Sequence, residues 1–215
     1  GPVPFVVGNQ KPADHWKHLG WNPVQAGDDF RNSSKVLSSK NDGKELYVKC
    51  SPMQWPLNNV PAECAFETWI TLDRSTVQVR SKVKMNRSDR TFYAARIQEL
   101  PAIYLNSPYH RVFTPQGSEL KQIKYTPKKD FPWTSWFTSE CWAALVNDVD
   151  FGLGVYHPGC HFFSGGFAGK PGPGDAFSQS TGYLAPNFLE HLDHDGEFEF
   201  RYVLALGTLK QIRAE

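Results

Sequence analysis

Two glutamates, Glu99 and Glu140, stand beside strand-like segments in the most polar neighbourhoods of the chain. Pairs of carboxyl groups roughly 5–9.5 Å apart hydrolyse glycosidic bonds. We therefore expect Glu99 and Glu140 to act as an acid/base pair around one cleft. In lyase chemistry the base would instead be Tyr104, with the Arg96 guanidinium neutralising charge. A surface ion pair at a strand end is the simpler alternative for Arg96 and Glu99.

Three tryptophans lie within the ten residues from Trp133 to Trp142. Exposed indoles stack on the apolar faces of sugar rings, whereas buried ones fill cores. Trp142 lies in an apolar run, so we expect it in the core. Polar residues flank Trp133 and Trp136, which predicts an exposed stacking platform.

The histidines form two groups, one after the Phe151–Tyr156 segment and one in His191–His194. We expect His157 and His191 to be polar anchors for a bound substrate. The His-x-Asp-His arrangement leads at once into a turn-like Asp195-Gly196, which makes a weak zinc motif. We expect no metal, and each histidine could simply be structural.

The four cysteines allow three pairings and contain no Cys-x-x-Cys pair. They are either free buried thiols or two local disulfides that each close a short loop. Our prediction is the second, with Cys50 bonded to Cys64 and Cys141 to Cys160. Sequons at Asn32 and Asn86 predict glycosylation and, with the disulfides, a secreted chain.

Charge and composition exclude several classes of partner. Lys plus Arg is 23 and Asp plus Glu is 22, so the net charge of +1 provides no basic field for nucleic acid. No apolar run reaches the ~20 residues of a membrane helix. The sequence has no Gly-rich phosphate-binding loop and neither a Gly-x-Ser-x-Gly nor a His-Glu-x-x-His motif, so we expect no cofactor.

Alternation of apolar and polar residues is the main structural signal. In Thr76–Met85 the valines and Met85 alternate with Gln78, Arg80, Lys82 and Lys84, which predicts an antiparallel strand with one wet face. Phe66–Leu72 and Phe198–Leu206 alternate in the same way. Cys141–Val146 and Phe151–Tyr156 predict a hairpin buried on both faces.

Helix signals are sparse, and Pro12–Leu19 could form two turns. Gly152 and Gly154 alternate along one predicted strand, so something should pack close to that backbone, with a bulky ring as the first candidate. Many short strands punctuated by Pro and Gly predict an all-β antiparallel β-sandwich with under about a tenth helix. We expect a single domain over residues 1–215.

Several motifs together resemble a family of secreted, largely uncharacterised microbial β-rich proteins. They are Trp21–Asp28, Pro52–Trp55, Gln98–Ala102, Trp142–Val146, Gly152–Val155, Thr181–Tyr183 and Leu206–Thr208. The match covers the chain from residue 19 onward. More loosely, this family is similar to the galactose-mutarotase-like β-supersandwich, a scaffold of sugar epimerases and of parts of polysaccharide lyases. The resemblance implies that family members carry further strands before the position of Gly1.

These observations favour a secreted carbohydrate-active protein that acts on a polysaccharide or oligosaccharide in a cleft, as a glycoside hydrolase or a lyase. One alternative is a non-catalytic, lectin-like carbohydrate-binding module, which needs the same aromatics but no carboxyl group of raised pKa. A structural extracellular protein with all its aromatics internal is the third. A fold alone does not choose among them.

Overall fold

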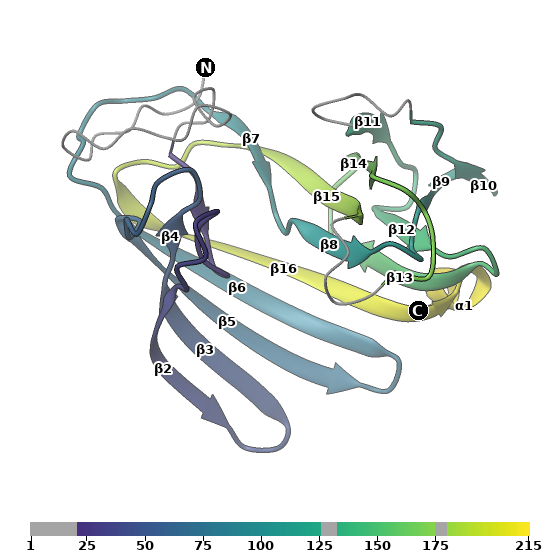
Figure 1. Ribbon diagram of the computed structural model, residues 1–215, viewed down its shortest axis with the longest axis horizontal. Helices are drawn as coiled ribbons and strands as arrows, with labels where there is room; N and C mark the ends of the chain where they lie inside the picture. The colour runs from purple at the N-terminus through teal and green to yellow at the C-terminus, as the bar shows by residue number, and fades with distance from the viewer. Residues whose placement is uncertain (1–20, 126–132, 175–179) are drawn as a thin grey trace. The chain divides into compact units, whose positions relative to one another are not determined.

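The computed structural model describes residues 21–125, 133–174 and 180–215 (Figure 1). The chain divides into two compact units, and each is described by itself. The described part of the first unit comprises 21–71, Arg80–Ala95 and His191–Phe200. The second comprises Leu72–Val79, Arg201–Glu215 and the described part of Arg96–Glu190. The expected helix over Pro12–Leu19 lies outside the described residues, and the expectation of a single domain stays a prediction.

Antiparallel strands build the first unit, in the order β16-β6-β5-β3-β2, with β1 paired to β4. Their bounds are β1 (Pro23–Val24), β2 (Lys35–Asn41), β3 (Glu45–Ser51), β4 (Met53–Gln54), β5 (Cys64–Asp73), β6 (Thr76–Asn86) and β16 (Asp195–Thr208). Strands β5, β6 and β16 contribute residues to both units.

The predicted alternation of β6 is confirmed. Val83 and Met85 are buried in a core with Ala62 and Cys64, while Lys84 is exposed. On the opposite, wet face, cross-strand ion pairs join Arg80 to Glu199 and Lys82 to Glu197. The strand therefore has one apolar and one charged side, as a period of two residues requires.

Asp28 organises the loop that contains the Trp21–Asp28 motif. Its buried carboxylate accepts hydrogen bonds from the backbone N–H groups of Phe30, Asn32 and Asn59 and from the Asn32 amide. Burial opposes ionisation, but these hydrogen bonds outweigh it and hold the pKa of Asp28 below its usual value. Gly27 has φ 143°, and a β-carbon there would lie 2.3 Å from the Asn32 carbonyl oxygen. The Gly27-Asp28 pair is thus explained by loop structure.

The second unit is an antiparallel β-sandwich. Its strands are β7 (Arg96–Glu99), β8 (Ile103–Asn106), β9 (Arg111–Gln116), β10 (Glu119–Gln122), β11 (Thr134–Phe137), β12 (Trp142–Val146), β13 (Phe151–Tyr156), β14 (Phe162–Ala168), β15 (Thr181–Glu190) and the end of β16. One sheet has the order β10-β9-β12-β13-β16, and the other has β11-β14-β15-β7, with β8 also paired to β15. Val112, Leu145, Trp136, Phe163 and Leu184 pack between them.

The buried hairpin is confirmed as β12 and β13, in which all five residues of β12 are buried. Gly154 lies under Ile212 of α1 (Leu209–Ala214), since a β-carbon at Gly154 would be 2.3 Å from Cγ2 of Ile212. The group packed over this glycine is therefore an aliphatic side chain and not an aromatic ring. A capping box of Thr208 and Gln211 begins α1, the one helix among the described residues. It has six residues, which agrees with the expected low helix content.

The cysteines correct a prediction, because all four are free thiols. Cys50 lies opposite Phe66 in the β3–β5 register, so Cys64, two residues before Phe66, is its diagonal neighbour. Diagonal neighbours on paired strands are typically about 7–8 Å apart, which is too far for a disulfide bond. The Cys160 thiol turns into the sandwich and donates to the carbonyls of Phe162 and Asn187. The Cys141 thiol faces His161 instead.

Candidate functional site

The two faces of the sheet formed by β11, β14, β15, β8 and β7 differ in character. Trp136, Phe163 and Leu184 enter the sandwich core from alternate positions of three strands. The residues between them therefore lie on the opposite face. We call that side the outer face, and it carries an aromatic cluster, a polar row and a phenylalanine pair.

Tyr183 is the centre of the aromatic cluster. It is directly opposite Tyr104 in the β8–β15 register, and the two ring centroids are 4.9 Å apart. Trp133 stacks on Tyr183 at 4.6 Å with an interplanar angle of 26°. Tyr183 is only 1% exposed, whereas Tyr104 is 64% exposed. The cluster therefore presents one open aromatic ring and one half-buried indole above a fixed, buried ring.

Glu99 places a carboxylate beside this cluster. It is exposed at the end of β7 and hydrogen-bonds with the Tyr183 hydroxyl. Burial first, and then the Glu99 charge, raise the pKa of Tyr183 far above its usual value. The Tyr183 hydroxyl thus remains a hydrogen-bond donor near neutral pH.

The polar row crosses three strands next to Glu99. Asn187 of β15 is opposite Glu99 in register, and its amide donates to Ser164 Oγ at 2.6 Å. Ser164 Oγ is 2.9 Å from Ser135 Oγ on β11. Asn187 is buried, and its Oδ1 has no hydrogen-bond partner among the described residues. Because Asn187 is buried, the groups of the row that solvent can reach are the hydroxyls of Ser135 and Ser164.

Phe137 and Phe162 form the phenylalanine pair of the outer face. They are opposite each other in the β11–β14 register, with ring centroids 5.1 Å apart. Phe137 is 71% exposed, which is unusual for so large an apolar side chain. The polar row thus has aromatic rings on β11 and β14 beside it as well as on β8 and β15.

Of the residues predicted from sequence, this face brings together Glu99, Tyr104 and Trp133. Arg96 is also on β7 but three positions from Glu99, and it is half-buried where Glu99 is exposed. Strand alternation puts the two side chains on opposite faces, so Arg96 does not extend toward the outer face with Glu99. Sequence reasoning missed Tyr183, Asn187 and Ser164, because only strand pairing places them beside Glu99.

Glu140 has a different set of neighbours. It accepts a hydrogen bond from Trp142 Nε1 and forms an ion pair with Arg213 of α1. Burial acts to raise the pKa of Glu140, but Arg213 and Trp142 lower it to a net value below the usual one. A general acid needs the opposite shift. Glu140 and Glu99 share no hydrogen bond or ion pair in the described part of the chain, and their pairing around one cleft stays a prediction.

Trp136 and His157 are in the core, contrary to the expectation that they line a site. Trp136 is 7% exposed and stacks on Phe163, since the polar residues beside it alternate to the other face. Trp142 is buried, as expected. His157 is buried with its ring 4.3 Å from that of Phe188, and burial lowers its pKa.

His191 belongs to the first unit, whereas the outer face is built from strands of the second. It is exposed, and its ring lies 4.8 Å from that of Phe92. The described residues contain no group of three or more His, Cys, Asp or Glu side chains suited to a metal ion. In the described part of the chain, no helix is long and apolar enough to cross a membrane.

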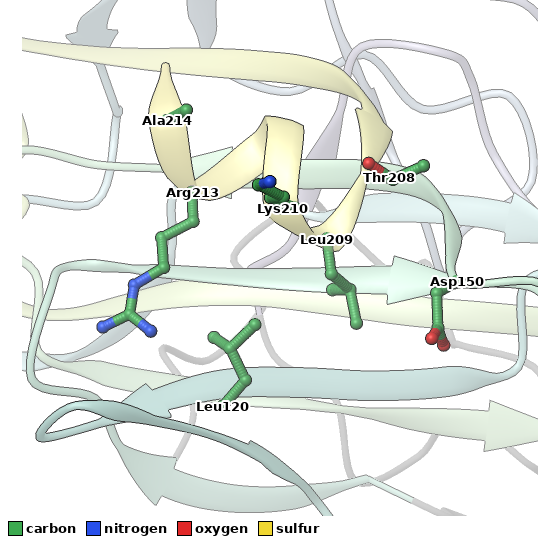
Figure 2. A pocket seen from close by; sticks show the side chains of 7 residues that line it. All are labelled: Leu120, Asp150, Thr208, Leu209, Lys210, Arg213 and Ala214. Atoms are coloured by element: carbon green, nitrogen blue, oxygen red, sulfur yellow. The ribbon is translucent and has the colours of Figure 1, made fainter.

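A pocket of about 680 Å³ lies beside α1 (Figure 2), and it is less suited than the outer face to binding or chemistry. Its lining residues are Leu120, Asp150, Thr208, Leu209, Lys210, Arg213 and Ala214. Asp150 is already paired with Arg111 at 2.6 Å, and Arg213 is paired with Glu140. The charged groups of the pocket are therefore largely committed to structural contacts.

No family model and no curated protein matches the sequence. Among solved structures, the chain is similar to a galactose mutarotase-related enzyme from Lactobacillus acidophilus, at 12% identity and a TM-score of 0.45, over 81% of this chain and 71% of that one. It is also similar to an alpha-galactosidase from Lactobacillus brevis, at 10% identity and a TM-score of 0.47, over 82% of this chain and 26% of that one. The chain thus spans about a quarter of that second protein. Similarities this weak transfer no activity.

Proposed function

We propose that the outer face of the second unit binds a carbohydrate chain. The observation that carries this proposal is the open Tyr104 ring, with Trp133 stacked beside it on Tyr183, next to the Glu99 carboxylate. Aromatic rings offer flat apolar surfaces with polar edges, which suit the apolar face of a sugar. Carboxylate and hydroxyl groups, as in Glu99, Ser135 and Ser164, suit the sugar's hydroxyls.

The extent of the face supports an oligosaccharide or polysaccharide over a single sugar. The aromatic cluster and the phenylalanine pair occupy different strands, and the polar row of Ser135, Ser164 and Asn187 lies on the strands that carry them. A chain of several sugar units could stack on both groups of rings and hydrogen-bond between them. Ring contacts of Tyr104 and Trp133 with the buried Tyr183 restrain both side chains, which reduces the side-chain freedom lost on binding.

Binding without catalysis is the reading that the geometry favours. Glu140, one member of the expected acid/base pair, has a lowered pKa and is paired with Arg213. Glu99 is exposed on the face of a sheet, and the pocket beside α1 does not include it. Catalysis is the second candidate, and the observation that favours it is the Glu99 carboxylate hydrogen-bonded to the Tyr183 phenol.

A glycan array followed by product analysis on the same polysaccharides tests both candidates. Retention of intact glycans, with no shortened or unsaturated products, is the result expected for a binding module. Shortened products would indicate a hydrolase, and unsaturated products a lyase. Absence of binding to every glycan offered, by protein whose fold is verified by circular dichroism, would contradict the proposal.

A further inference from the structure

Two cross-strand pairs, one of serines and one of phenylalanines, are neighbours on the outer face. Ser135 is opposite Ser164 in the β11–β14 register, and Phe137 is opposite Phe162. On each strand the two residues are two positions apart, so both pairs point to the same side, roughly 7 Å apart along the strands. Ser135 and Phe137 are exposed, whereas Ser164 and Phe162 are half-buried. A ligand on this part of the face therefore meets hydroxyl groups and phenyl rings side by side.

The hydrogen bonds of the polar row have a direction, and the buried Asn187 sets it. Its Nδ2 donates to Ser164 Oγ at 2.6 Å, while its Oδ1 has no hydrogen-bond partner among the described residues. With the amide turned the other way, the NH2 group would occupy that partnerless position. A buried N–H group without an acceptor is rarer than a carbonyl oxygen without a donor. The amide nitrogen therefore faces Ser164.

The Ser164 hydroxyl transmits this direction to Ser135. Ser164 Oγ accepts from Asn187, and the two serine oxygens are 2.9 Å apart. In the described ranges of the chain, Ser135 Oγ is the one acceptor within reach of the Ser164 hydroxyl proton. Hydrogen bonds in such a chain strengthen one another when each hydroxyl accepts on one side and donates on the other. The Ser135 proton is left for a ligand, so the exposed end of the polar row is a hydrogen-bond donor.

We propose that this part of the outer face binds an acetyl group carried by the carbohydrate, an inference that rests on the proposed function. The acetyl carbonyl oxygen can only accept, so it matches the Ser135 hydroxyl as donor. The acetyl methyl group packs on the Phe137 ring, which is 71% exposed, and both apolar surfaces are removed from water. A sugar hydroxyl also accepts from Ser135, but it gives the neighbouring phenyl rings no apolar partner. The arrangement therefore favours N-acetylated or O-acetylated sugars over their unacetylated counterparts.

Calorimetric titration with paired glycans tests this proposal. The pairs are chitohexaose with cellohexaose for N-acetyl groups, acetylated with alkali-treated xylan for O-acetyl groups, and each acetylated glycan that the array detects with its deacetylated form. We expect the acetylated member of at least one pair to bind about ten-fold more tightly. Equal affinities, tighter binding of the unacetylated members, or binding only to glycans without acetyl groups would overturn this proposal and leave the proposed function standing. Absence of binding to every glycan would overturn both.

Ser135→Ala and Phe137→Ala test the two contacts separately. Each should bring the ratio of the two affinities closer to one, because the carbonyl oxygen loses its donor or the methyl group loses its ring. The matched controls are Ser118→Ala, at an exposed serine between β9 and β10, and Phe92→Ala, at a 73% exposed phenylalanine of the first unit. Both controls should keep the ratio of the unchanged protein, and circular dichroism verifies that each variant is folded. An unaltered ratio in folded Ser135→Ala or Phe137→Ala would contradict the assignment of the acetyl group to this surface.

Discussion

Tyr104 lies directly opposite Tyr183 across the β8–β15 pair, and the two ring centroids are 4.9 Å apart although the residues are 79 positions apart in the sequence. This relationship joins an exposed ring to a buried one on the same face. The buried ring in turn supports Trp133 and contacts Glu99. The candidate binding surface is thus created by strand pairing between segments that are far apart in the chain.

Replacement of the Glu99 carboxylate should weaken sugar binding without unfolding the protein. Glu99→Gln removes a charged acceptor from an exposed position, so we expect about a ten-fold loss of affinity, or ~1.4 kcal/mol, and an unchanged melting temperature. Isothermal titration calorimetry with a glycan that the array identifies measures this. Glu119→Gln, at an exposed position on β10, is the control and should bind normally. Equal affinity for both variants would exclude Glu99 from the site.

Asp28 should be a major source of stability in the first unit. Asp28→Ala leaves three backbone N–H groups without their acceptor, and we expect a loss of about 2–4 kcal/mol in the free energy of unfolding. Urea denaturation followed by tryptophan fluorescence measures the change. Asp29→Ala, at the exposed neighbouring position, should cost much less. Similar losses for the two variants would contradict the assigned role.

The same carboxylate predicts an acid dependence. The native pKa of Asp28 is lowered relative to the unfolded chain, so its stabilisation is complete above the usual Asp pKa and is lost as pH falls through the native value. The free energies of unfolding of Asp28→Ala and of the unchanged protein, measured by denaturation at a series of acid pH values, should therefore converge as the pH falls. A stability difference between them that stays constant down to the lowest pH at which the protein folds would be inconsistent with this assignment.

The packing of α1 on β13 predicts a compensating pair of substitutions. Gly154→Ala puts a methyl group against Ile212 and should destabilise the second unit by about 1–3 kcal/mol. Ile212→Ala makes room for that methyl group, so the double variant should be more stable than the sum of the two single losses implies. Thermal unfolding of the four proteins measures the coupling. Strict additivity would mean that the two residues do not touch.

Much of the fold could be predicted from local patterns. The period-two alternation of Thr76–Met85 correctly predicted the two faces of β6. The two neighbouring apolar runs correctly predicted the β12–β13 hairpin. Both predictions succeed because buried strand positions carry apolar residues and exposed positions carry polar ones. Trp136 shows where this reasoning fails. Its flanking residues are polar, which suggested exposure, but in a strand the neighbours of an inward residue point outward.

The site was less accessible to prediction, because it depends on strand order. Glu99 and Trp133 were identified by residue type, but only the pairing of β15 with β7 and β8 places Tyr183 and Asn187 among them. The disulfide prediction failed for a similar reason. The loops between the paired cysteines were short enough for disulfide bonds. However, strand register and side-chain direction decide whether two sulfur atoms come within bonding distance.

The central claim is that the outer face binds carbohydrate through its aromatic cluster, and one titration tests it most directly. The affinity of a glycan identified by the array is measured by calorimetry for the unchanged protein, Tyr104→Ala and Tyr156→Ala. Tyr156 is the control, since it is also exposed but belongs to β13 of the other sheet. We predict that Tyr104→Ala loses roughly 1–1.5 kcal/mol of binding free energy, about ten-fold in affinity, while Tyr156→Ala binds normally. Unaltered binding by Tyr104→Ala would contradict the account.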